Sequence, residues 1–283
     1  MPIFPKCKGS SPIPLSSSLS SWLCGIRCAV LFRAAIRTSR PFPVSRKRAL
    51  VFAPHQDDET FGCGGMIALK CRQGTPVAVV FLTDGNRSHI DKPEISLPDL
   101  PEIRRREALT ALQVLGVTET AITFLSQPDF GLHTLATSER EELLEHLTGL
   151  MRGFQPEEVY VPHRHDRHPD HEETFKLAHT ALERAGLNPD VWQYPIWLFW
   201  WKNWPFLQVK GRDMAHAYRL PLGLVHERKK RAIAAYQSQM PILPPGFLER
   251  FLSSQEVFFK VMSAAHAVED EKASTGRNGV DKT

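Results

Sequence analysis

The stretch 49-ALVFAPHQDDETFGCGG-65 passes from an apolar run into a cluster of acids and then into glycines. Residues 49–53 are apolar at every position and end at Pro54, which is typical of a strand buried on both faces of a sheet. Residues 60–72 predict a helix that ends at a glycine. Between the strand and the helix, His55 is followed by crowded carboxylates, which repel one another unless they are solvated or a cation lies among them.

Strands and helices alternate through the first two thirds of the chain. Further apolar strands are predicted at 76–85, 121–125 and 158–162, and further helices at 102–115, 138–153 and 169–184. Because the strands are apolar throughout, we expect an α/β protein with a three-layer, Rossmann-like fold, in which helices flank a mostly parallel sheet. Ligands bind at the carboxyl ends of the strands in such sheets, so the polar residues that follow the strands are expected on one rim.

Composition and charge divide the chain into unequal parts. The 283 residues, 42% hydrophobic and 23% charged, suffice for one large α/β domain or two small ones. Residues 1–48 contain nine Lys or Arg and no acid, and since the whole chain carries +4, the other 235 residues carry −5. Serine and proline clusters predict a basic, disordered leader at 1–46. A catalytic domain is expected at 47–262, and the polar residues 263–283 predict a disordered tail. A basic leader can contact anionic lipid, so peripheral membrane contact is left open, whereas nucleic-acid binding is not expected.

Cysteine content and hydropathy favour a cytoplasmic protein. Five cysteines, three of them in the leader, are too few and too unevenly placed for a disulfide framework. The best apolar run, 22–32, is 11 residues long and contains Arg27, well short of the roughly 20 residues that span a bilayer. The same arginine interrupts the apolar region that a secretory signal needs.

A second chemical stretch, 162-PHRHDRHPDHEET-174, holds four histidines and two aspartates. Pro169 suits the first position of a helix, which makes His168 the predicted N-cap residue and puts His171 in the first turn. His163 and His165 precede the helix and are expected in a loop, with a supporting contact to the site left open.

The two stretches together predict a metal site. His55 and Asp58 are three residues apart, so one turn puts them on one side, and His171 can reach them across the rim. Two imidazoles and one carboxylate form a three-ligand site for Zn²⁺ that leaves positions open for water, although Fe²⁺ or another divalent metal also accepts this set. Asp57 is left as a free base, and the charge of the metal offsets the repulsion among the acids.

Both stretches resemble the signatures of the LmbE-like and PIG-L-like N-acetylglucosaminyl de-N-acetylases. The family patterns P-H-P-D-D-E and H-P-D-H stand here as 54-PHQDDE-59 and 168-HPDH-171. The family's R-x-x-E and K-x-x-A-x-x-x-Y/H-x-S-Q helices resemble 104-RRRE-107 and 230-KRAIAAYQSQ-239, so the likeness spans about residues 48–240. Gln56 departs from the family's proline, and because proline carries no ligand atom, metal binding is expected to survive.

The resemblance implies a zinc hydrolase that removes the acetyl group from an N-acetylglucosaminyl, or related N-acetyl amino sugar, conjugate. Carried over by position, His55, Asp58 and His171 are the zinc ligands, and Asp57 is the general base. Glu59 has no ligand role in this scheme, and a structural role at the start of the helix is expected.

The resemblance also implies groups that act on the substrate. His168 is the acid or oxyanion stabiliser, and a contact with Asp170 or Asp166 is expected to keep it protonated. Arg104 and Asp129 are implied on the substrate side.

The run 192-WQYPIWLFWWKNWPF-206 holds five of the six tryptophans. These side chains are expected to pack in the core, to line a sugar pocket or to contact a membrane surface. Two rival functions stay open: a non-haem Fe(II) oxygenase, which uses the same ligand types, and a glycan-binding homologue without activity. The intact signatures and the spare Asp57 favour hydrolysis.

Overall fold

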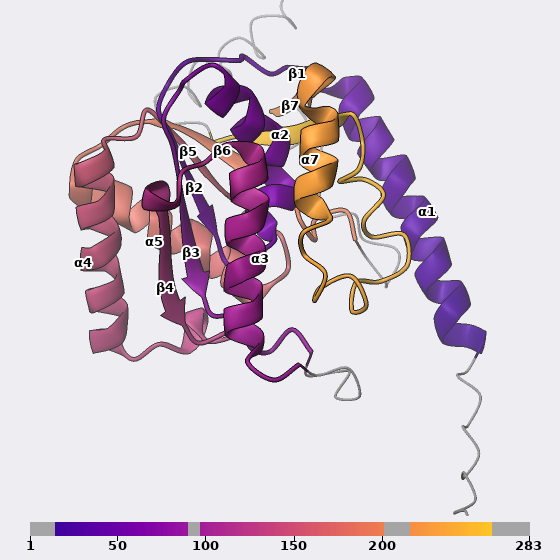
Figure 1. Cartoon of the computed structure of the whole chain (residues 1–283), viewed down its shortest axis with the longest axis horizontal. Helices are drawn as coiled ribbons and strands as arrows, with labels where there is room; N and C mark the ends of the chain where they lie inside the picture. Colours follow the sequence, from indigo (N-terminus) through magenta and orange to yellow (C-terminus); the bar gives the residue numbers. More distant parts are fainter. Residues whose placement is uncertain (1–14, 90–96, 201–215, 262–283) are drawn as a thin grey trace, which may run out of the picture.

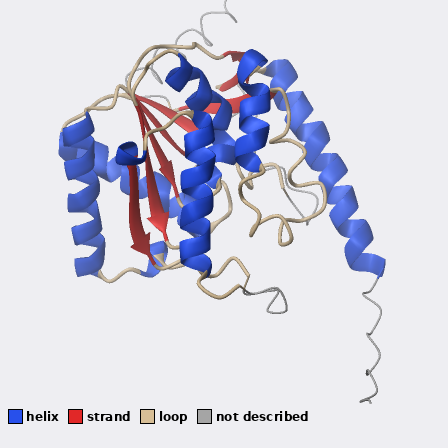
Figure 2. Ribbon diagram, viewed as in Figure 1, coloured by secondary structure: helices blue, strands red, loops and turns tan. Residues whose placement is uncertain are grey.

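The computed structural model describes residues 15–89, 97–200 and 216–261. Within these ranges the chain forms an eight-stranded sheet with helices on both faces (Figures 1 and 2). The strands are β1 (Arg40–Pro41), β2 (Ala49–Ala53), β3 (Val77–Thr83), β4 (Ile122–Gln127), β5 (Glu158–Pro162), β6 (Asp190–Tyr194), β7 (Ala217–Pro221) and β8 (Gln255–Lys260). The helices are α1 (Leu15–Thr38), α2 (Asp58–Arg72), α3 (Leu100–Leu115), α4 (Thr137–Phe154), α5 (Pro169–Ala185) and α7 (His226–Ile233). Single 3₁₀ turns lie at Glu119–Ala121, Leu132–Thr134 and Gly223–Val225.

The sheet is parallel over most of its width. The strand order is β1-β7-β8-β6-β5-β2-β3-β4, and every neighbouring pair from β6 to β4 is parallel. Strand β8 runs antiparallel to β6 and to β7, and β7 pairs in parallel with β1. The predicted α/β fold with a mostly parallel, helix-flanked sheet is confirmed.

Strand β2 lies between two cores. Its first, third and fifth residues, Ala49, Val51 and Ala53, belong to the core that is packed by α2, α3 and α7. Leu50 and Phe52 belong to the core that is packed by α4 and α5. Successive side chains of a strand point to opposite faces, so a strand covered on both faces is apolar at every position.

The predicted strands and helices of residues 49–185 agree with the structure to within one or two residues. Helix α2 begins at Asp58, two residues before its predicted start. The cause is local, because the carbonyl of Asp57 accepts hydrogen bonds from the backbone N–H groups of Thr60 and Phe61 at 3.1 and 2.9 Å.

The glycines after Phe61 allow α2 to pack closely. A Cβ at Gly62 would lie 2.3 Å from Cδ2 of Tyr194, and one at Gly65 would lie 2.2 Å from Cδ2 of Leu222. The hydroxyl of Tyr194 in turn donates to the carbonyl of Phe52 at 2.7 Å. The missing side chains therefore let α2 approach β6 immediately behind the first signature.

The N-terminal segment differs from the disordered leader expected at 1–46. Helix α1 packs along one side of the molecule, against β7 and β8 (Figure 1). It buries Cys24, Cys28, Phe32 and Ala35, and the Phe32 ring meets that of Phe199 edge-on at 5.9 Å between centroids. These four residues recur at helical spacing and so form one face of the helix. The serine and proline clusters of the leader concealed this periodicity.

None of the described helices is both long enough and apolar enough to cross a membrane. Cys28, Cys63 and Cys71 form no disulfide among the described residues. Residues 1–14 and the predicted tail at 263–283 lie outside the described residues.

Candidate active site and metal centre

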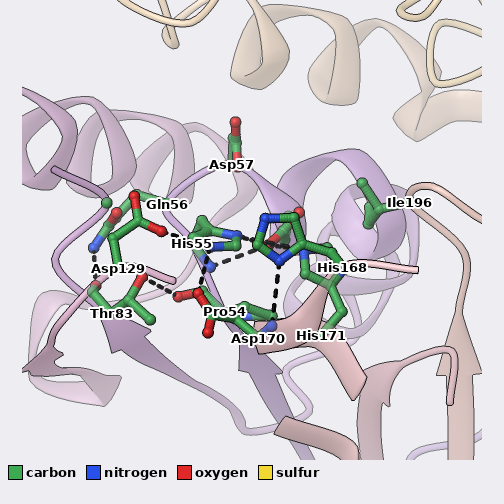
Figure 3. Close-up of polar contacts among 12 residues, drawn as sticks. Pro54, His55, Gln56, Asp57, Thr83, Asp129, His168, Asp170, His171 and Ile196 are labelled. Carbon is green, nitrogen blue, oxygen red and sulfur yellow. Dashed lines mark hydrogen bonds and ion pairs between the residues drawn. The ribbon is translucent and has the colours of Figure 1, made fainter. Parts of the chain in front are cut away.

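The two signatures meet at the carboxyl ends of the strands (Figure 3). His55 lies two residues beyond β2, Asp58 opens α2, and His171 lies in the first turn of α5. The His55 and His171 rings are 5.3 Å apart between centroids, and all three side chains are buried. The structure thus brings together the three residues predicted as metal ligands.

The candidate ligand atoms form a small triangle. Nδ1 of His55 lies 3.1 Å from Oδ2 of Asp58, and Nε2 of His171 lies 3.3 Å from each of these atoms. Zinc bonds of roughly 2.0–2.2 Å at tetrahedral angles put ligand atoms about 3.3–3.5 Å apart. The residues present therefore fit a zinc ion.

Each of these histidines has a carboxylate beside its other ring nitrogen. Nδ1 of His171 lies 2.8 Å from Oδ2 of Asp166. Nε2 of His55 lies 3.2 Å from Oδ1 of Asp129 and 3.3 Å from Oδ2 of Asp170. Metal-binding histidines usually donate their second N–H to such a group, which fixes the tautomer and leaves the first nitrogen free for the metal. The arrangement supports Nδ1 of His55 and Nε2 of His171 as metal donors.

Contrary to the expectation from the sequence, the carboxylate of Asp170 does not hold His168. Its carboxylate turns to His55 and accepts the backbone N–H groups of Phe130 and Leu132 at 2.7 and 3.2 Å. Asp129 also supports His55, and its own Oδ2 accepts the N–H of Arg87 at 2.9 Å.

Asp166, the other expected partner of His168, holds His171 instead. Its carboxylate also accepts the backbone N–H groups of Ile196, Trp197 and Leu198 at 3.0, 2.9 and 2.8 Å. Sequence spacing could not show these partners, because they lie 30 to 32 residues further along the chain.

The described residues contain two other groupings of potential ligand atoms. Ligand atoms of His55, His168 and His171 lie within 4.8 Å of one another, as do those of His55, Asp129 and Asp170. We favour the triangle because its separations match tetrahedral zinc and because Asp129 and Asp170 face the nitrogen of His55 that points away from it.

The clustered charges shift pKa values in opposite directions. Burial acts against the charged form of Asp58, but the neighbouring His171 and His55 hold the pKa of Asp58 well below its usual range. Burial lowers the pKa of His55, yet the three carboxylates around it raise that pKa well above its usual value. Burial also lowers the pKa of His171, but Asp58 and Asp166 raise that pKa to about 9. The cluster therefore favours ionised carboxylates with positive charge among them.

Asp57 stands apart from this cluster and lines the adjoining pocket (Figure 3). Its φ of 152° is a conformation that residues other than glycine rarely adopt. Oε2 of Glu59 accepts its backbone N–H at 3.2 Å, and Nη2 of Arg104 lies 3.4 Å from its Oδ1. Burial raises the pKa of Asp57 to about 7, although Arg104 lowers it. A pocket-facing carboxyl with a pKa near neutrality suits a general base.

Arg104 is buried behind Asp57. Nη2 of Arg104 donates to the carbonyl of Gln56 at 2.9 Å, and Nη1 donates to that of Gly85 at 3.2 Å. Nε2 of Gln56 donates to the carbonyl of Thr83 at 2.7 Å. The residue that replaces the family's proline thus joins the loop after β2 to the end of β3, and Arg104 anchors that loop from behind.

His168 caps α5, as its position before Pro169 predicted. Its Nδ1 accepts the backbone N–H of Asp170 at 3.3 Å, so the neutral ring carries its proton on Nε2. Burial, together with the positive charge of His55 and His171, lowers the pKa of His168 to about 2. The expectation of a protonated His168 is therefore wrong, and the side chain is a neutral donor through Nε2.

The later family motif, residues 230–239, supports the site from behind, although its helix α7 ends at Ile233 and the rest of the motif forms turns. The hydroxyl of Tyr236 donates to Oε1 of Glu59, which confirms the structural role expected for Glu59. Oε1 and Oε2 of Glu107 accept the N–H and the hydroxyl of Ser238 at 2.7 and 2.6 Å. Glu107 on α3 thereby holds the turns that follow α7, and the next residue, Gln239, is buried and lines the pocket.

A cavity of about 420 Å³ opens beside Asp57 and His168. Trp197 and Trp200 line it, whereas Trp192 is buried in β6, so the tryptophan-rich run serves both core and pocket. The rest of that run, 201–206, lies outside the described residues. The other apolar lining residues are Phe61, Phe130, Ile196, Ile242, Leu243, Pro244 and Phe247, and the polar and charged ones include Arg87, Arg104, Asp129, Arg167 and Gln239.

Sequence reasoning missed part of this lining. Arg87 and Arg167 carry no signal beyond their charge, whereas Gln239 is the last residue of the later family motif and could have been found there. His163 and His165 lie in the turn before α5, where the N–H of His165 donates to Nδ1 of His163 at 3.2 Å.

Residues 50–182 match the family model of PIG-L, described as GlcNAc-PI de-N-acetylase. The match contains both signatures, and the resemblance that they indicated is confirmed. The chain is 28% identical over 167 residues to the 1D-myo-inositol 2-acetamido-2-deoxy-alpha-D-glucopyranoside deacetylase of Kineococcus radiotolerans, an alignment that covers 50% of this chain and 46% of that protein.

Two further relatives extend the comparison. A 4-oxalmesaconate hydratase of Pseudomonas putida is 29% identical over 162 residues, which cover 54% of this chain and 59% of that protein. The solved N,N'-diacetylchitobiose deacetylase of Pyrococcus horikoshii is 26% identical with a TM-score of 0.53, over 76% of this chain and 84% of that one. The chain spans about half the length of the curated relatives it matches.

Proposed function

We propose that the protein is a zinc-dependent amide hydrolase that removes the acetyl group from an N-acetylglucosaminyl, or related N-acetyl amino sugar, conjugate. The observation that carries the proposal is the triangle of His55 Nδ1, Asp58 Oδ2 and His171 Nε2, 3.1 to 3.3 Å on each side, with Asp57 beside it at the pocket. The PIG-L match and the deacetylases among the relatives support it.

The side chains at the pocket have the chemistry that amide hydrolysis needs. Bound zinc would supply a water of lowered pKa and would polarise the acetyl carbonyl. Asp57 would accept a proton from the attacking water, and Nε2–H of His168 would donate to the carbonyl oxygen as it becomes negative. When the C–N bond breaks, the proton on Asp57 would pass to the leaving amine, which gives acetate and the free amino sugar. Asp170 would act indirectly, by holding His55.

Substrate recognition is assigned to the pocket. Asp129 and Arg104 line it, and contacts of these two residues with the sugar remain a proposal. Trp197 and Trp200 offer faces on which a sugar ring or an aglycone can stack. Peripheral membrane contact through the basic segment or the tryptophan-rich run, and a cytoplasmic location, likewise stay predictions.

A hydratase is the second candidate, because one relative is a 4-oxalmesaconate hydratase. A base that takes a proton from water can serve addition of water to a carbon–carbon double bond as well as hydrolysis. The two reactions differ in their products, since only hydrolysis releases acetate.

The decisive experiment is acetate release from a panel of N-acetylglucosaminyl conjugates by the zinc-loaded protein. We expect release from at least one conjugate and its loss on chelation. Metal analysis and oxygen uptake on the same samples test the Fe(II) oxygenase. Hydration of an unsaturated dicarboxylic acid without acetate release would favour the hydratase. Zinc binding without any turnover would favour a glycan-binding protein without enzymatic activity.

A further inference from the structure

A buried ion pair between Lys229 and Glu256 contacts the backbone of helix α2. In a regular helix the N–H of Gly65 donates to the carbonyl of Phe61. Here the N–H groups of Gly65 and Met66 donate to Oε1 and Oε2 of Glu256 at 2.6 and 2.9 Å. The carbonyl of Phe61 accepts from Nζ of Lys229 at 2.8 Å, and Nζ lies 2.7 Å from Oε1 of Glu256. Both groups of that backbone pair thus take a partner from the Lys229–Glu256 pair.

The glycines of the first signature make room for this pair. The side chains of Lys229 and Glu256 are only 1% and 2% exposed. A Cβ at Gly64 would lie 3.3 Å from Cγ of Lys229, and one at Gly65 would lie 3.0 Å from Oε1 of Glu256. Larger residues at these positions would push the pair away from the backbone of α2.

The pair contacts α2 where its first turn, Asp58–Phe61, joins the rest of the helix. That turn follows Asp57 and contains Asp58, and the Phe61 ring lines the pocket. We propose that the Lys229–Glu256 pair is a positioning element that sets the orientation of this turn, and so the placement of Asp57 and Asp58 against His171. The inference deepens the proposed metal site and rests on it.

Stability alone gives a poor reason for such a pair. Charges buried together lose their hydration, and well-packed apolar residues in their place often leave stability unchanged or raise it. A requirement for a fixed orientation of the first turn of α2 explains why two charges lie there.

The chain offers a matched control on the same helix. Lys70, near the end of α2, lies 2.6 Å from Glu158, and both side chains are 3% exposed. Nζ of Lys70 also donates to the carbonyl of Lys47 at 2.8 Å. This pair joins α2 to β5 near the end of the helix, away from the first turn.

The test compares two double variants of the full chain, Lys229→Met with Glu256→Leu, and Lys70→Met with Glu158→Gln. Zinc affinity is measured by competition with a chromogenic chelator, the cobalt-loaded proteins give ligand-field spectra, and acetate release gives kcat and KM. We expect the first variant to bind zinc about 10- to 100-fold more weakly, as for other supports of metal ligands, with an altered cobalt spectrum and a fall in kcat larger than the change in KM. The control variant should keep the wild-type zinc affinity and spectrum.

Unchanged zinc affinity and cobalt spectrum in the first variant would overturn the inference, as would an equal loss in both variants. If that variant does not fold, the same measurements on Glu256→Gln decide the matter, because its amide offers one acceptor oxygen for two N–H groups. The metal titrations need no substrate. A wild-type protein that binds zinc but releases no acetate would therefore refute the proposed function and leave this test intact.

Discussion

At the scale of single residues, adjacent aspartates in one turn have different surroundings. Asp58 is placed between two histidines, which keep its carboxyl ionised. Asp57 is turned out of the cluster by an unusual backbone angle and lies near Arg104 at the pocket. The difference supports the proposed roles of Asp58 in metal binding and of Asp57 in proton transfer.

Replacement of these aspartates by asparagine should separate the two assignments. Asp57→Asn should bind one zinc ion and lose about 100- to 10,000-fold in kcat, because the proton acceptor is gone. Asp58→Asn should lose zinc itself. Zinc content and acetate release measured on both proteins provide the check, and loss of zinc from Asp57→Asn would contradict the role given to Asp57.

His168 yields a second prediction, because it both caps a helix and faces the pocket. His168→Ala should lower kcat by about 100- to 1,000-fold through loss of the Nε2 donor. It should also lower the free energy of unfolding by about 1 kcal/mol through loss of the cap. His168→Asn can keep the cap but not the donor, so it should lose rate with little loss of stability. Equal rates in wild type and His168→Asn would remove His168 from the mechanism.

The sequence predicted which candidate ligands come together better than it predicted the contacts that support them. His55, Asp58 and His171 follow from their spacing after strands, because parallel strands end on one rim. The partners of Asp166 and Asp170 depend on which way each carboxylate turns, and spacing carries no information about that. The same limit produced the incorrect expectation of a protonated His168.

At the scale of elements, the glycines of α2 lead to a test of packing. Gly65→Ala would put Cβ 2.2 Å from Leu222, and such overpacking should lower the free energy of unfolding by about 1–3 kcal/mol. Gly149→Ala on α4 is the matched control, because nothing lies within 4 Å of its Cβ position. It should raise stability by about 0.5–1 kcal/mol, as expected for a helical glycine with free space. Urea denaturation measures both, and equal effects would contradict the packing described for α2.

The strands and helices with a clear apolar periodicity were predicted from the sequence. Helix α1, whose periodicity is less clear, was missed. Apolar strands and amphipathic helices from 49 to 185 agree with the structure, because burial on one or both faces imposes their periodicity. In α1 most of the buried residues are small and arginines lie among them, so the segment resembled a disordered leader. Burial against β7 and β8, which no local pattern shows, explains why it is helical.

At the scale of the whole molecule, α1 is part of the core. Phe32 is 8% exposed, whereas Val30 on the same helix is 56% exposed. Phe32→Ala should therefore cost about 3–5 kcal/mol of unfolding free energy. Val30→Ala should stay within about 0.5 kcal/mol of wild type. Thermal or urea unfolding of both proteins gives the comparison, and a wild-type midpoint for Phe32→Ala would mean that α1 is only loosely attached.

Zinc should stabilise the whole fold as well as the site. A ligand that binds only the folded protein adds about 2.7 kcal/mol at a concentration 100 times its Kd. We expect this increase in wild type and in Asp57→Asn, and no increase in Asp58→Asn. Unfolding with and without a chelator measures it, and stabilisation of Asp58→Asn would move the metal to another set of ligands.

Asp166 holds His171 through one ring nitrogen and the backbone of Ile196, Trp197 and Leu198 through three N–H groups. One carboxylate therefore serves both a candidate metal ligand and the aromatic side of the pocket. The coupling between two linked binding sites is reciprocal. If a substrate group shifts Trp197 and thereby strengthens zinc binding, bound zinc must strengthen the binding of that substrate by the same factor. The protein would then select its substrate and retain its metal through a single shared equilibrium.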